Sequence, residues 1–458
     1  MCGMTPLWTS AEIAAATGGT ASADFDITGV AFDSREVGPG DLFVALKGGA
    51  TDGHRFVAQA MEQGAAAALV SHPVDGPHIL VADTTAALDD LGRAARARMT
   101  GVVIGVTGSV GKTGVKEALY AALDRGWRGR VHRSVKSYNN HTGVPLSLAR
   151  MPRDSRAAVL EMGMNHPGEL AALTRLVRPH IAIITAIAPS HIEFFPDEAA
   201  IADAKAEIFQ RLEHGGTAIV PFDSPHRDRL LAQVPAHAIS ATFGKLDGAQ
   251  VRAIEAVRLK TGGSFVTARV RDRELSFTVS QPGAHWVSNA LAVLAAVDAA
   301  GADLGLAGLA LADLGGLPGR GARRTIPVAG GEALLIDESY NASPASMRAT
   351  LAVLAHEPGR RVAVLGDMRE LGALSAGYHA ELAGPLLDAR VELALLVGEA
   401  MAPLAAALED RLDFVHVPDV AAALECFPSM IRADDAILVK GSNGVGLSRL
   451  VAALGDKA

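Results

Sequence analysis

A glycine-rich segment, GVTGSVGKT at Gly105–Thr113, constrains the fold of this chain more than any other feature. It overlaps the end of the apolar, strand-like stretch Val102–Val106 and leads into Thr113–Leu123, where apolar residues recur at helical spacing. A glycine-rich turn between a strand and a helix directs backbone N–H groups and a helix N-terminus at one point, which suits nucleotide phosphates. We expect Lys112 to reach the outer phosphates and the Thr113 hydroxyl to bind Mg²⁺. The predicted loop residues are Gly108, Ser109, Val110, Gly111, Lys112 and Thr113.

The segment departs from the strict phosphate-loop pattern at one position. Val106 stands where a glycine is expected, with Gly105 and Gly108 on either side. The alternative interpretation is a tight turn between strand and helix that carries a surface lysine. The order Gly-Lys-Thr directly before a helical pattern favours nucleotide binding, so we expect a protein that uses ATP.

Length and composition limit the class of protein. With 458 residues the chain is long enough for two to four domains, and its 49% hydrophobic residues suit globular cores. The formal net charge of −8 speaks against a nucleic-acid or anionic-membrane surface. No run of about 18 apolar residues occurs and the first basic residue is Arg35, so we expect no membrane span, no secretory signal and a cytoplasmic location. Cys2 and Cys426 are too far apart in sequence to suggest a disulfide framework.

The first part of the chain has the pattern of a small α/β unit. We expect strands over Asp41–Lys47 and Ala65–Ser71 and a helix over Phe56–Gln63. A further helix over Ala86–Arg98 leads into the next domain.

From about residue 100 the chain alternates strands with helices, which indicates a mostly parallel sheet covered on both faces. The predicted strands are Val102–Val106, Ala157–Leu160, Ile181–Ile187 and Ala218–Pro221. Ligands collect at the carboxyl ends of such strands. The first is followed by the phosphate loop, the second by Glu161-Met162-Gly163 and the third by Ala188-Pro189-Ser190-His191.

The remaining segments complete a three-domain organisation. Arg252–Val279 alternates like an antiparallel excursion, Gly283–Asn289 opens the helix Ala290–Ala300, and the Gly- and Arg-rich Gly315–Arg324 is typical of a linker. The last third repeats the strand-then-polar rhythm at 333–336, 362–365, 393–397 and 436–439. We expect an α/β protein: a small N-terminal domain (1–98), a central phosphate-loop ATPase-type parallel sheet (99–319) and a C-terminal Rossmann-like doubly wound domain (320–458).

Several polar residues have both a chemical and a structural interpretation. Glu161 is a hard-oxygen ligand for a nucleotide-bound Mg²⁺ or a solvated carboxylate at a strand end. His191 taken alone is more often a hydrogen-bonded loop residue. Lys205 shares a face of the predicted helix Glu198–Leu212 with Ile201 and other apolar residues, and spacing alone favours an ammonium that snorkels to solvent.

Two further segments are open in the same way. Asn139 and Asn140 lie in a polar loop before the helix-like Pro145–Arg150, and taken alone they are turn residues. Arg320 is a surface charge, or a phosphate contact delivered when domains close.

The ordered set of motifs resembles the Mur ligase family, the ATP-dependent amide-bond-forming ligases of peptidoglycan assembly, over nearly the whole chain. Each motif is weak alone, and it is their order along the chain that is specific. They are Thr107–Thr113, Tyr138-Asn139-Asn140, Gly143–Leu146, Glu161-Met162-Gly163, His191, Ala204–Phe209, Asn289, Pro318–Arg320 and Asp337.

Within the family, Asp337–Pro344 with Ser346-Met347, Leu365–Gly372 and Val439–Ser442 resemble the member that adds the dipeptide D-Ala-D-Ala to a UDP-linked muramoyl tripeptide. The Asp-Asn-Pro-Arg signature of the diaminopimelate-adding sibling is absent from the sequence. Ser343 replaces the second Asn of the usual Asn-Ala-Asn-Pro, and Asn443 stands where a basic residue often follows Lys-Gly-Ser.

The resemblance implies roles for individual residues. The family's matching lysine is carbamylated, which implies that Lys205 faces inward and binds a second Mg²⁺ with Glu161 and His191. Lys112, Lys205 and His191 would be catalytic, and ATP would also contact Asn139, Asn140, Asn289, Arg320, Asp337 and Tyr340. The first domain would hold the UDP end of the substrate through Ser34, Arg35, Lys47, Asp52 and His54. The third domain would bind the dipeptide through residues that include Asn341 and Lys440, and would close on ATP.

Two alternatives remain open. One is a sibling ligase, which adds a single amino acid to a muramoyl peptide or acts as a folylpolyglutamate-type synthetase. The other is a phosphate-loop switch without ligase chemistry, which has no need of a carboxylate, an imidazole and an inward lysine at one site. We expect a monomer that acts on small molecules and binds neither nucleic acid nor membrane.

Overall fold

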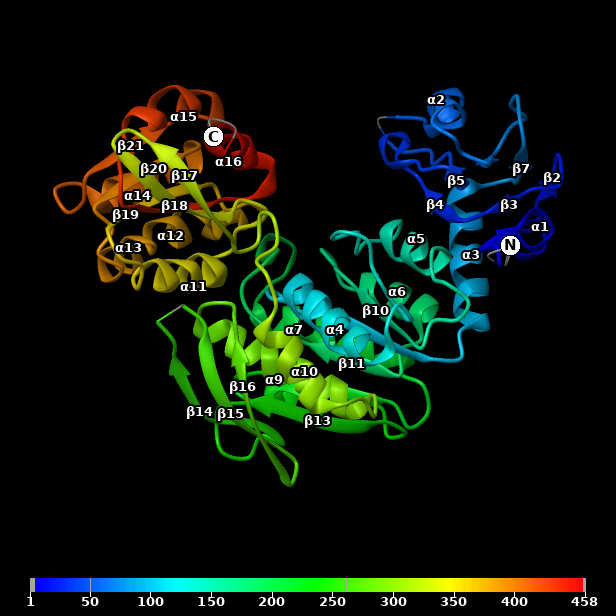
Figure 1. The fold of residues 1–458 in the computed structure, drawn as a ribbon, viewed down its shortest axis with the longest axis horizontal. Coiled ribbons are helices and arrows are strands. Elements are labelled where there is room, and N and C mark those ends of the chain that lie inside the picture. The colour runs from blue at the N-terminus through cyan, green and yellow to red at the C-terminus, as the bar shows by residue number, and fades with distance from the viewer. Residues whose placement is uncertain (1–4, 50, 261, 456–458) are drawn as a thin grey trace.

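The computed structural model describes residues 5–49, 51–260 and 262–455, so Cys2 lies outside the described residues. Figure 1 shows the N-terminal part (blue) and the C-terminal part (orange to red) standing apart from one another, each against the central part of the chain. Each part is built around its own β-sheet. Within the described residues, no helix combines the length and the apolar character needed to cross a membrane.

The N-terminal sheet has the strand order β2-β7-β6-β5-β4, parallel except for β2, beside the small antiparallel pair β1-β3. The expected strand at 41–47 ends at Val44, since Lys47 bridges to Asp52 instead. The helix expected from Ala86 begins at Thr84, because the Asp83 side chain accepts hydrogen bonds from the first turn. The elements are β1 (Trp8–Thr9), α1 (Ser10–Thr17), β2 (Thr20–Ala21), β3 (Asp26–Ile27), β4 (Gly29–Ala31), η1 (Ser34–Glu36), β5 (Asp41–Val44), η2 (Gly53–Phe56), α2 (Val57–Glu62), β6 (Ala67–Val70), β7 (His78–Leu80) and α3 (Thr84–Arg98).

The central sheet has the strand order β16-β15-β14-β13-β12-β11-β8-β10-β9. From β14 to β9 the strands are parallel, and β14, β15 and β16 form the antiparallel excursion expected from the sequence. The elements are β8 (Val102–Thr107), α4 (Lys112–Trp127), β9 (Val131–Arg133), α5 (Gly143–Ala149), β10 (Ala157–Glu161), α6 (Glu169–Val177), β11 (Ile181–Ile184), η3 (Ile192–Phe194), α7 (Glu198–Ala206), η4 (Glu207–Arg211), β12 (Thr217–Pro221), α8 (Arg227–Leu231), β13 (Ile239–Gly244), β14 (Val251–Arg258), β15 (Ser264–Val270), β16 (Arg273–Val279), α9 (Ala284–Ala299) and α10 (Leu304–Ala312).

Both faces of the parallel strands β8, β10, β11 and β12 are buried, which explains their near-continuous apolar sequences. In β8, Ile104 and Val106 belong to the hydrophobic core that includes α4, α9 and α10, whereas Val103 belongs to the core that includes α5 and α6. Alternate side chains of β8 therefore pack into two different cores. Polar groups are found at the ends of the strands.

Three predicted elements of the central part differ from the structure. The strand expected to reach Ile187 ends at Ile184, because the following residues bind the phosphate loop. The helix expected over Glu198–Leu212 is α-helical only to Ala206 and continues as the 3₁₀ helix η4. The helix expected from Ala290 begins earlier, at Ala284.

The C-terminal sheet has the order β17-β18-β22-β19-β20-β21 and is parallel except for β17. The predicted linker ends in β17, which starts at Ala322. The α/β class is confirmed, with one large sheet in each of the three parts beside the two-stranded pair β1-β3, whereas the boundaries at 98/99 and 319/320 stay predictions. The elements are β17 (Ala322–Val328), β18 (Gly331–Glu338), α11 (Pro344–Leu354), β19 (Arg360–Gly366), η5 (Gly372–Leu374), α12 (Ser375–Ala380), α13 (Ala383–Asp388), β20 (Leu393–Val397), η6 (Glu399–Met401), α14 (Ala402–Leu408), β21 (Phe414–Val417), α15 (Val420–Cys426), η7 (Phe427–Ser429), β22 (Asp435–Lys440), η8 (Asn443–Val445) and α16 (Leu447–Gly455).

Candidate functional site

The glycine-rich loop joins β8 to α4 in a conformation that needs its glycines. Gly108 has a φ of 149°, and a Cβ added there would lie 1.9 Å from Oγ1 of Thr185. Gly111, with a φ of 87°, directly precedes the first residue of α4. The loop is held from the neighbouring strand β11, because the Thr185 hydroxyl donates to the Val110 carbonyl (2.5 Å) and the Ser109 N–H donates to the Ala186 carbonyl (2.8 Å). Its free N–H groups and the N-terminus of α4 therefore face a fixed point.

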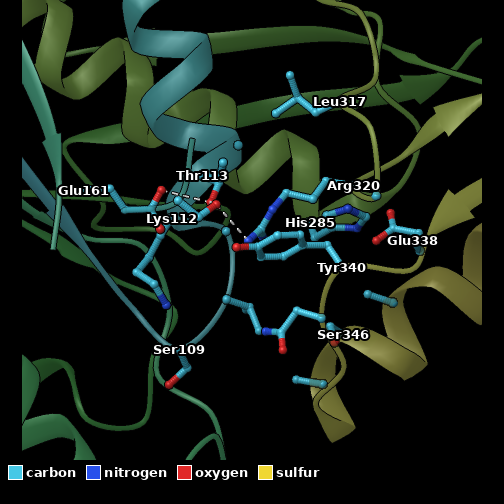
Figure 2. A pocket seen from close by; sticks show the side chains of 18 of the residues that line it. Ser109, Lys112, Thr113, Glu161, His285, Leu317, Arg320, Glu338, Tyr340 and Ser346 are labelled. Atoms are coloured by element: carbon cyan, nitrogen blue, oxygen red, sulfur yellow. Dashed lines mark hydrogen bonds between the residues drawn. The ribbon is translucent and has the colours of Figure 1, made fainter. Parts of the chain in front are cut away.

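A cavity of about 490 Å³ lies between this loop and the C-terminal domain. In Figure 2, Thr113 and Glu161 lie across it from Glu338 and Ser346 of the C-terminal domain. The three predicted groups that the site most needs, Lys112, Glu161 and His191, all line this cavity. The other predicted residues that line it are Ser109, Val110, Gly111, Thr113, Asn139, Asn289, Arg320, Tyr340, Asn341 and Lys440.

Glu161, at the end of β10, is buried and held by two neutral donors. The Thr113 hydroxyl donates to its Oε2 at 2.9 Å and the Asn139 side-chain amide donates to its Oε1 at 2.7 Å. Within the described parts of the chain, no lysine, arginine or histidine forms an ion pair with this carboxylate. A buried carboxylate without a cationic partner is suited to a bound cation.

Lys205 is only 1% exposed, so the interpretation of a snorkelling side chain is wrong. It lies among buried residues of α7 and η4, including Ile201 and Ile208. Its ammonium forms no ion pair or hydrogen bond with residues that the structure describes. Desolvation lowers the pKa of Lys205 well below its usual value, and the charge of Lys112 lowers it further. Both effects favour the neutral amine.

The donor groups fit Mg²⁺ only together with further oxygens. No group of three His, Cys, Asp or Glu side chains that could hold a metal occurs in residues 5–49, 51–260 and 262–455. The cavity offers the Thr113 hydroxyl, the Glu161 carboxylate and the His191 imidazole. Mg²⁺ is commonly held by one or two carboxylates plus substrate phosphates, so this set suits a metal that arrives with a nucleotide.

The C-terminal wall of the cavity carries two cations. The Arg320 guanidinium stacks on the Tyr340 ring with its Cζ 4.2 Å from the ring centroid, and it donates to the Ser137 hydroxyl at 3.2 Å. Lys440 is buried and donates to the Asn341 carbonyl at 2.9 Å. Desolvation lowers the pKa of Lys440, an effect that the nearby Glu338 carboxylate opposes. Positive charge therefore faces the phosphate loop from the opposite domain.

His191 follows β11 and also meets the C-terminal domain. Its backbone is left-handed, with a φ of 58°, and its Nδ1 contacts the Glu370 carboxylate. The contact with His191 lowers the pKa of Glu370 below its usual value.

Four predicted ATP or metal residues do not line the cavity. The Asn140 side-chain oxygen accepts from the Gly143 N–H at 2.9 Å and so holds the start of α5. Asp337 accepts from the Gly319 N–H at 2.8 Å and thereby fixes the turn that carries Arg320. The Gly108 carbonyl accepts from Nζ of Lys112 at 2.6 Å, and Lys205 is buried.

The residues predicted to hold the UDP end lie in the N-terminal domain, and none of them lines this cavity. Arg35 pairs with Asp33 and is largely exposed, and the Ser34 hydroxyl donates to the Gln59 side chain at 3.2 Å. The Asp52 side chain caps η2 and lies 2.6 Å from Nδ1 of His54. The backbone of Asp52 forms an isolated β-bridge with that of Lys47. Their binding role stays a prediction.

Sequence reasoning missed several residues of the site. His285 and Trp286 line the cavity from the first turn of α9, a segment that the sequence marked only as the start of a helix. Desolvation, aided by Lys440 and Lys245, lowers the pKa of His285 to about 4, so its ring is neutral at neutral pH. Glu338 and Ser346 also face the cavity (Figure 2). Lys116 is a lysine within the apolar face of α4, an unusual position that could have been noticed in the sequence. It donates to the Ser134 carbonyl and so orders the loop before Asn139.

Three domain models of one protein family match this chain in order. "Mur ligase family, catalytic domain" matches residues 26–105, "Mur ligase middle domain" matches 106–297, and "Mur ligase, glutamate ligase domain" matches 323–443. Together the matches cover β3 to β16 and β18 to β22, and they include the residues from Ser109 to Asn289 that line the cavity.

Similar proteins match this chain over nearly its whole length. It is 34% identical over 437 residues to the UDP-N-acetylmuramoyl-tripeptide–D-alanyl-D-alanine ligase of Escherichia coli (strain K12), which covers 94% of each protein. A crystal structure of MurF from Acinetobacter baumannii superposes with a TM-score of 0.84 at 32% identity and covers 98% of both chains. The MurF ligase from Thermotoga maritima in complex with ADP gives a TM-score of 0.76 at 27% identity, covering 93% of this chain and 96% of that one.

Proposed function

Since this chain belongs to the Mur ligase family, we propose that it uses ATP to join D-alanyl-D-alanine to a UDP-N-acetylmuramoyl tripeptide in peptidoglycan synthesis. The observation that carries the proposal is the convergence of Lys112, Glu161 and His191 on one cavity that the C-terminal domain closes from the other side. An amide ligase must bring ATP, a carboxylate and an amine together. This cavity lies between the phosphate loop and the C-terminal domain, where the three reactants can meet.

The reaction proceeds in two balanced steps. A terminal carboxylate oxygen of the tripeptide attacks the γ-phosphorus of ATP, the bond to the β-phosphate oxygen breaks, and ADP leaves. The neutral amine of the dipeptide then attacks the acyl carbon of the acyl phosphate. Inorganic phosphate leaves, and the attacking nitrogen loses a proton as the amide forms.

The chief barrier to the first step is the mutual repulsion of two anions. Lys112 neutralises the β- and γ-phosphates while the loop N–H groups hold them in line with the carboxylate. Asn139 fixes the Glu161 carboxylate and presents its amide to the same space. Arg320 and Lys440 add positive charge from the C-terminal wall. Bound Mg²⁺, held by Thr113, Glu161 and His191, would neutralise phosphate and carboxylate oxygens.

Lys205 supplies further oxygens if its amine is carbamylated. A neutral amine adds to carbon dioxide, the new N–C bond forms the carbamate, and one proton is released. The depressed pKa of Lys205 supports this modification, because only the unprotonated amine reacts. The product is an anionic oxygen group next to Lys112, consistent with a second Mg²⁺.

The other substrate groups are bound by all three domains. Asn289 and Tyr340 contact the adenosine, and Asp337 acts through the turn that carries Arg320. Asn341 and Lys440 bind the dipeptide. The UDP end is bound by the residues Ser34, Arg35, Lys47, Asp52 and His54. The monomeric state and the cytoplasmic location stay predictions.

Acceptor-dependent phosphate release tests the proposal. The purified protein is mixed with ATP, Mg²⁺ and the tripeptide nucleotide, with D-Ala-D-Ala, with L-Ala-L-Ala or with no acceptor. We expect rapid release only with D-Ala-D-Ala. Equal release in all three mixtures would mean a nucleotide switch or simple ATPase. Release in a fourth mixture, with a single amino acid or glutamate in place of the dipeptide, would mean a sibling ligase.

A further inference from the structure

Two strained residues meet where the central and C-terminal domains touch. His191 has a φ of 58° and Glu370 a φ of 62°, and non-glycine residues adopt such left-handed conformations rarely. The His191 Nδ1 contacts the Glu370 carboxylate. Strain of this kind persists only where the surroundings impose it, and it concentrates at functional sites.

The contact is ordered on both sides of the two residues. The Glu193 N–H donates to the Glu370 carbonyl at 3.3 Å. Gly372, with a φ of 54°, packs so closely that an added Cβ would lie 3.2 Å from Cβ of Glu193. The 3₁₀ helices η3 and η5 thus abut directly after the two strained residues, and the backbone holds the carboxylate against the imidazole.

The two nitrogens of the His191 ring have different surroundings. Its Nδ1 side faces Glu370 while the ring lines the phosphate-loop cavity, so Nε2 is the nitrogen left for a ligand in that cavity. A histidine that binds a metal through one nitrogen usually donates from the other to a carboxylate, which fixes its tautomer and orientation. Here the carboxylate comes from a different domain than the histidine.

We propose that Glu370 is a positioning residue, which orients His191 for the metal and so couples the placement of the C-terminal domain to the metal-binding wall. The proposal rests on the proposed function, since it needs His191 as a ligand. Glu370 and His191 are both partly exposed, and an exposed ion pair contributes little to stability. The role of the pair is therefore orientation of the ring.

The test compares Glu370→Gln with two controls that disturb the same domain in other ways. Leu374→Ala loosens the exposed end of η5 and leaves the carboxylate in place. Glu381→Gln removes a different carboxylate of the C-terminal domain, which pairs with Arg348 on the surface. Binding of Mn²⁺ in the presence of β,γ-imido-ATP is titrated by electron paramagnetic resonance. The His191 tautomer is read from ¹⁵N–¹H correlation spectra of the metal-free protein, assigned with His191→Gln.

We expect Glu370→Gln to weaken Mn²⁺ binding roughly 10- to 100-fold, the usual effect of losing an outer partner of a metal ligand. The His191 nitrogen shifts should change from the Nδ1-protonated pattern to a mixture of tautomers. Both controls should keep the affinity and the shifts. The proposal is overturned if Glu370→Gln has the Mn²⁺ affinity and the His191 nitrogen shifts of the wild type. It is also overturned if Leu374→Ala weakens Mn²⁺ binding as much as Glu370→Gln does.

His191→Gln separates the two levels of the argument. If it weakens Mn²⁺ binding while Glu370→Gln does not, only the positioning role fails. If His191→Gln itself binds Mn²⁺ as the wild type does, His191 is not a ligand, and both the proposed metal site and the positioning role fall.

Discussion

The Thr113 hydroxyl donates a hydrogen bond of 2.9 Å to Oε2 of Glu161, joining the first turn of α4 to the end of β10. The two residues lie 48 positions apart, and β8, which leads through the loop into α4, pairs in parallel register with β10. The phosphate loop and the buried carboxylate are therefore parts of one rigid unit. Whatever binds at the loop lies beside the carboxylate.

Replacing the Thr113 hydroxyl tests this connection between the phosphate loop and Glu161. Thr113→Val keeps the shape of the side chain but removes the donor to Glu161 and the oxygen proposed for Mg²⁺. We expect kcat to fall roughly 10²- to 10³-fold, as for other single polar groups at a transition-state site. Thr113→Ser should stay within about a few-fold, since it keeps the hydroxyl. Phosphate release measures both, and a Thr113→Val variant as active as Thr113→Ser would contradict the role.

Gly108 is expected to tolerate no side chain. Gly108→Ala places a Cβ 1.9 Å from the Thr185 hydroxyl, so the loop must shift away from β11. We expect calorimetric titration to show ADP binding weakened at least roughly 100-fold, because the loop N–H groups lose their common focus. Gly377→Ala is the matched control, since a Cβ there meets no atom within 4 Å. Gly377 lies in α12, so this change should leave binding intact and raise stability by about 0.5–1 kcal/mol. Normal ADP binding by Gly108→Ala would refute the geometry.

Tyr340 is expected to hold Arg320 in place, in addition to its proposed contact with the adenosine. Tyr340→Ala removes the ring on which the guanidinium stacks, and a stacked cation over an aromatic ring is worth about 0.5–2 kcal/mol. We expect the Kd for β,γ-imido-ATP to rise roughly 2- to 30-fold. Tyr340→Phe keeps the ring and should bind as the wild type does. Calorimetry of the two variants decides, and equal loss in both would assign the effect to the hydroxyl instead.

The proposed carbamylation of Lys205 predicts that the rate of the reaction depends on carbon dioxide. Removing carbon dioxide and bicarbonate below pH 7 should slow the reaction, because the carbamate reverts to the amine, and added bicarbonate should restore it. With ¹³C-labelled bicarbonate a carbamate resonance should appear in the wild type and not in Lys205→Met. A bare amine in the active, nucleotide-bound protein would argue against the second metal.

His132 predicts loss of stability in acid. Desolvation lowers its pKa to about 4 although its Nε2 contacts the Ser147 carbonyl at 2.6 Å. The unfolded chain therefore binds the proton more tightly between about pH 6.5 and 4, and the free energy of unfolding falls by about 3 kcal/mol as pH drops through that range. Urea unfolding between pH 7 and 4 should show a weaker pH dependence in His132→Gln. The exposed His141→Gln should keep the wild-type dependence. Parallel curves for all three proteins would contradict the assignment.

The elements that position the site could be predicted from short-range patterns. Apolar strands of β8, β10 and β11 precede the loop, Glu161 and His191, and parallel pairing brings these ends to one edge. The two-sided burial of the sheet made those strands visible as apolar runs.

Contacts between domains could not be predicted in this way. Nothing near Glu370 in sequence indicates His191, and the role of Asp337 depends on the turn at Gly319. Asn140 and Asn139 are adjacent and chemically identical, yet one caps a helix and the other binds Glu161. Such choices depend on backbone geometry, which residue type alone does not determine. The burial of Lys205 likewise follows from packing that overrides the usual preference of a lysine for water.

The oxygen path through the reaction tests the central claim most directly. The tripeptide nucleotide is labelled with ¹⁸O in its terminal carboxylate and turned over with ATP, Mg²⁺ and D-Ala-D-Ala. If the carboxylate attacks the γ-phosphate in this cavity, each phosphate released carries one ¹⁸O, which mass spectrometry detects. Phosphate free of the label would show that water and not the carboxylate receives the phosphoryl group, and the account of this site as an amide ligase would be wrong.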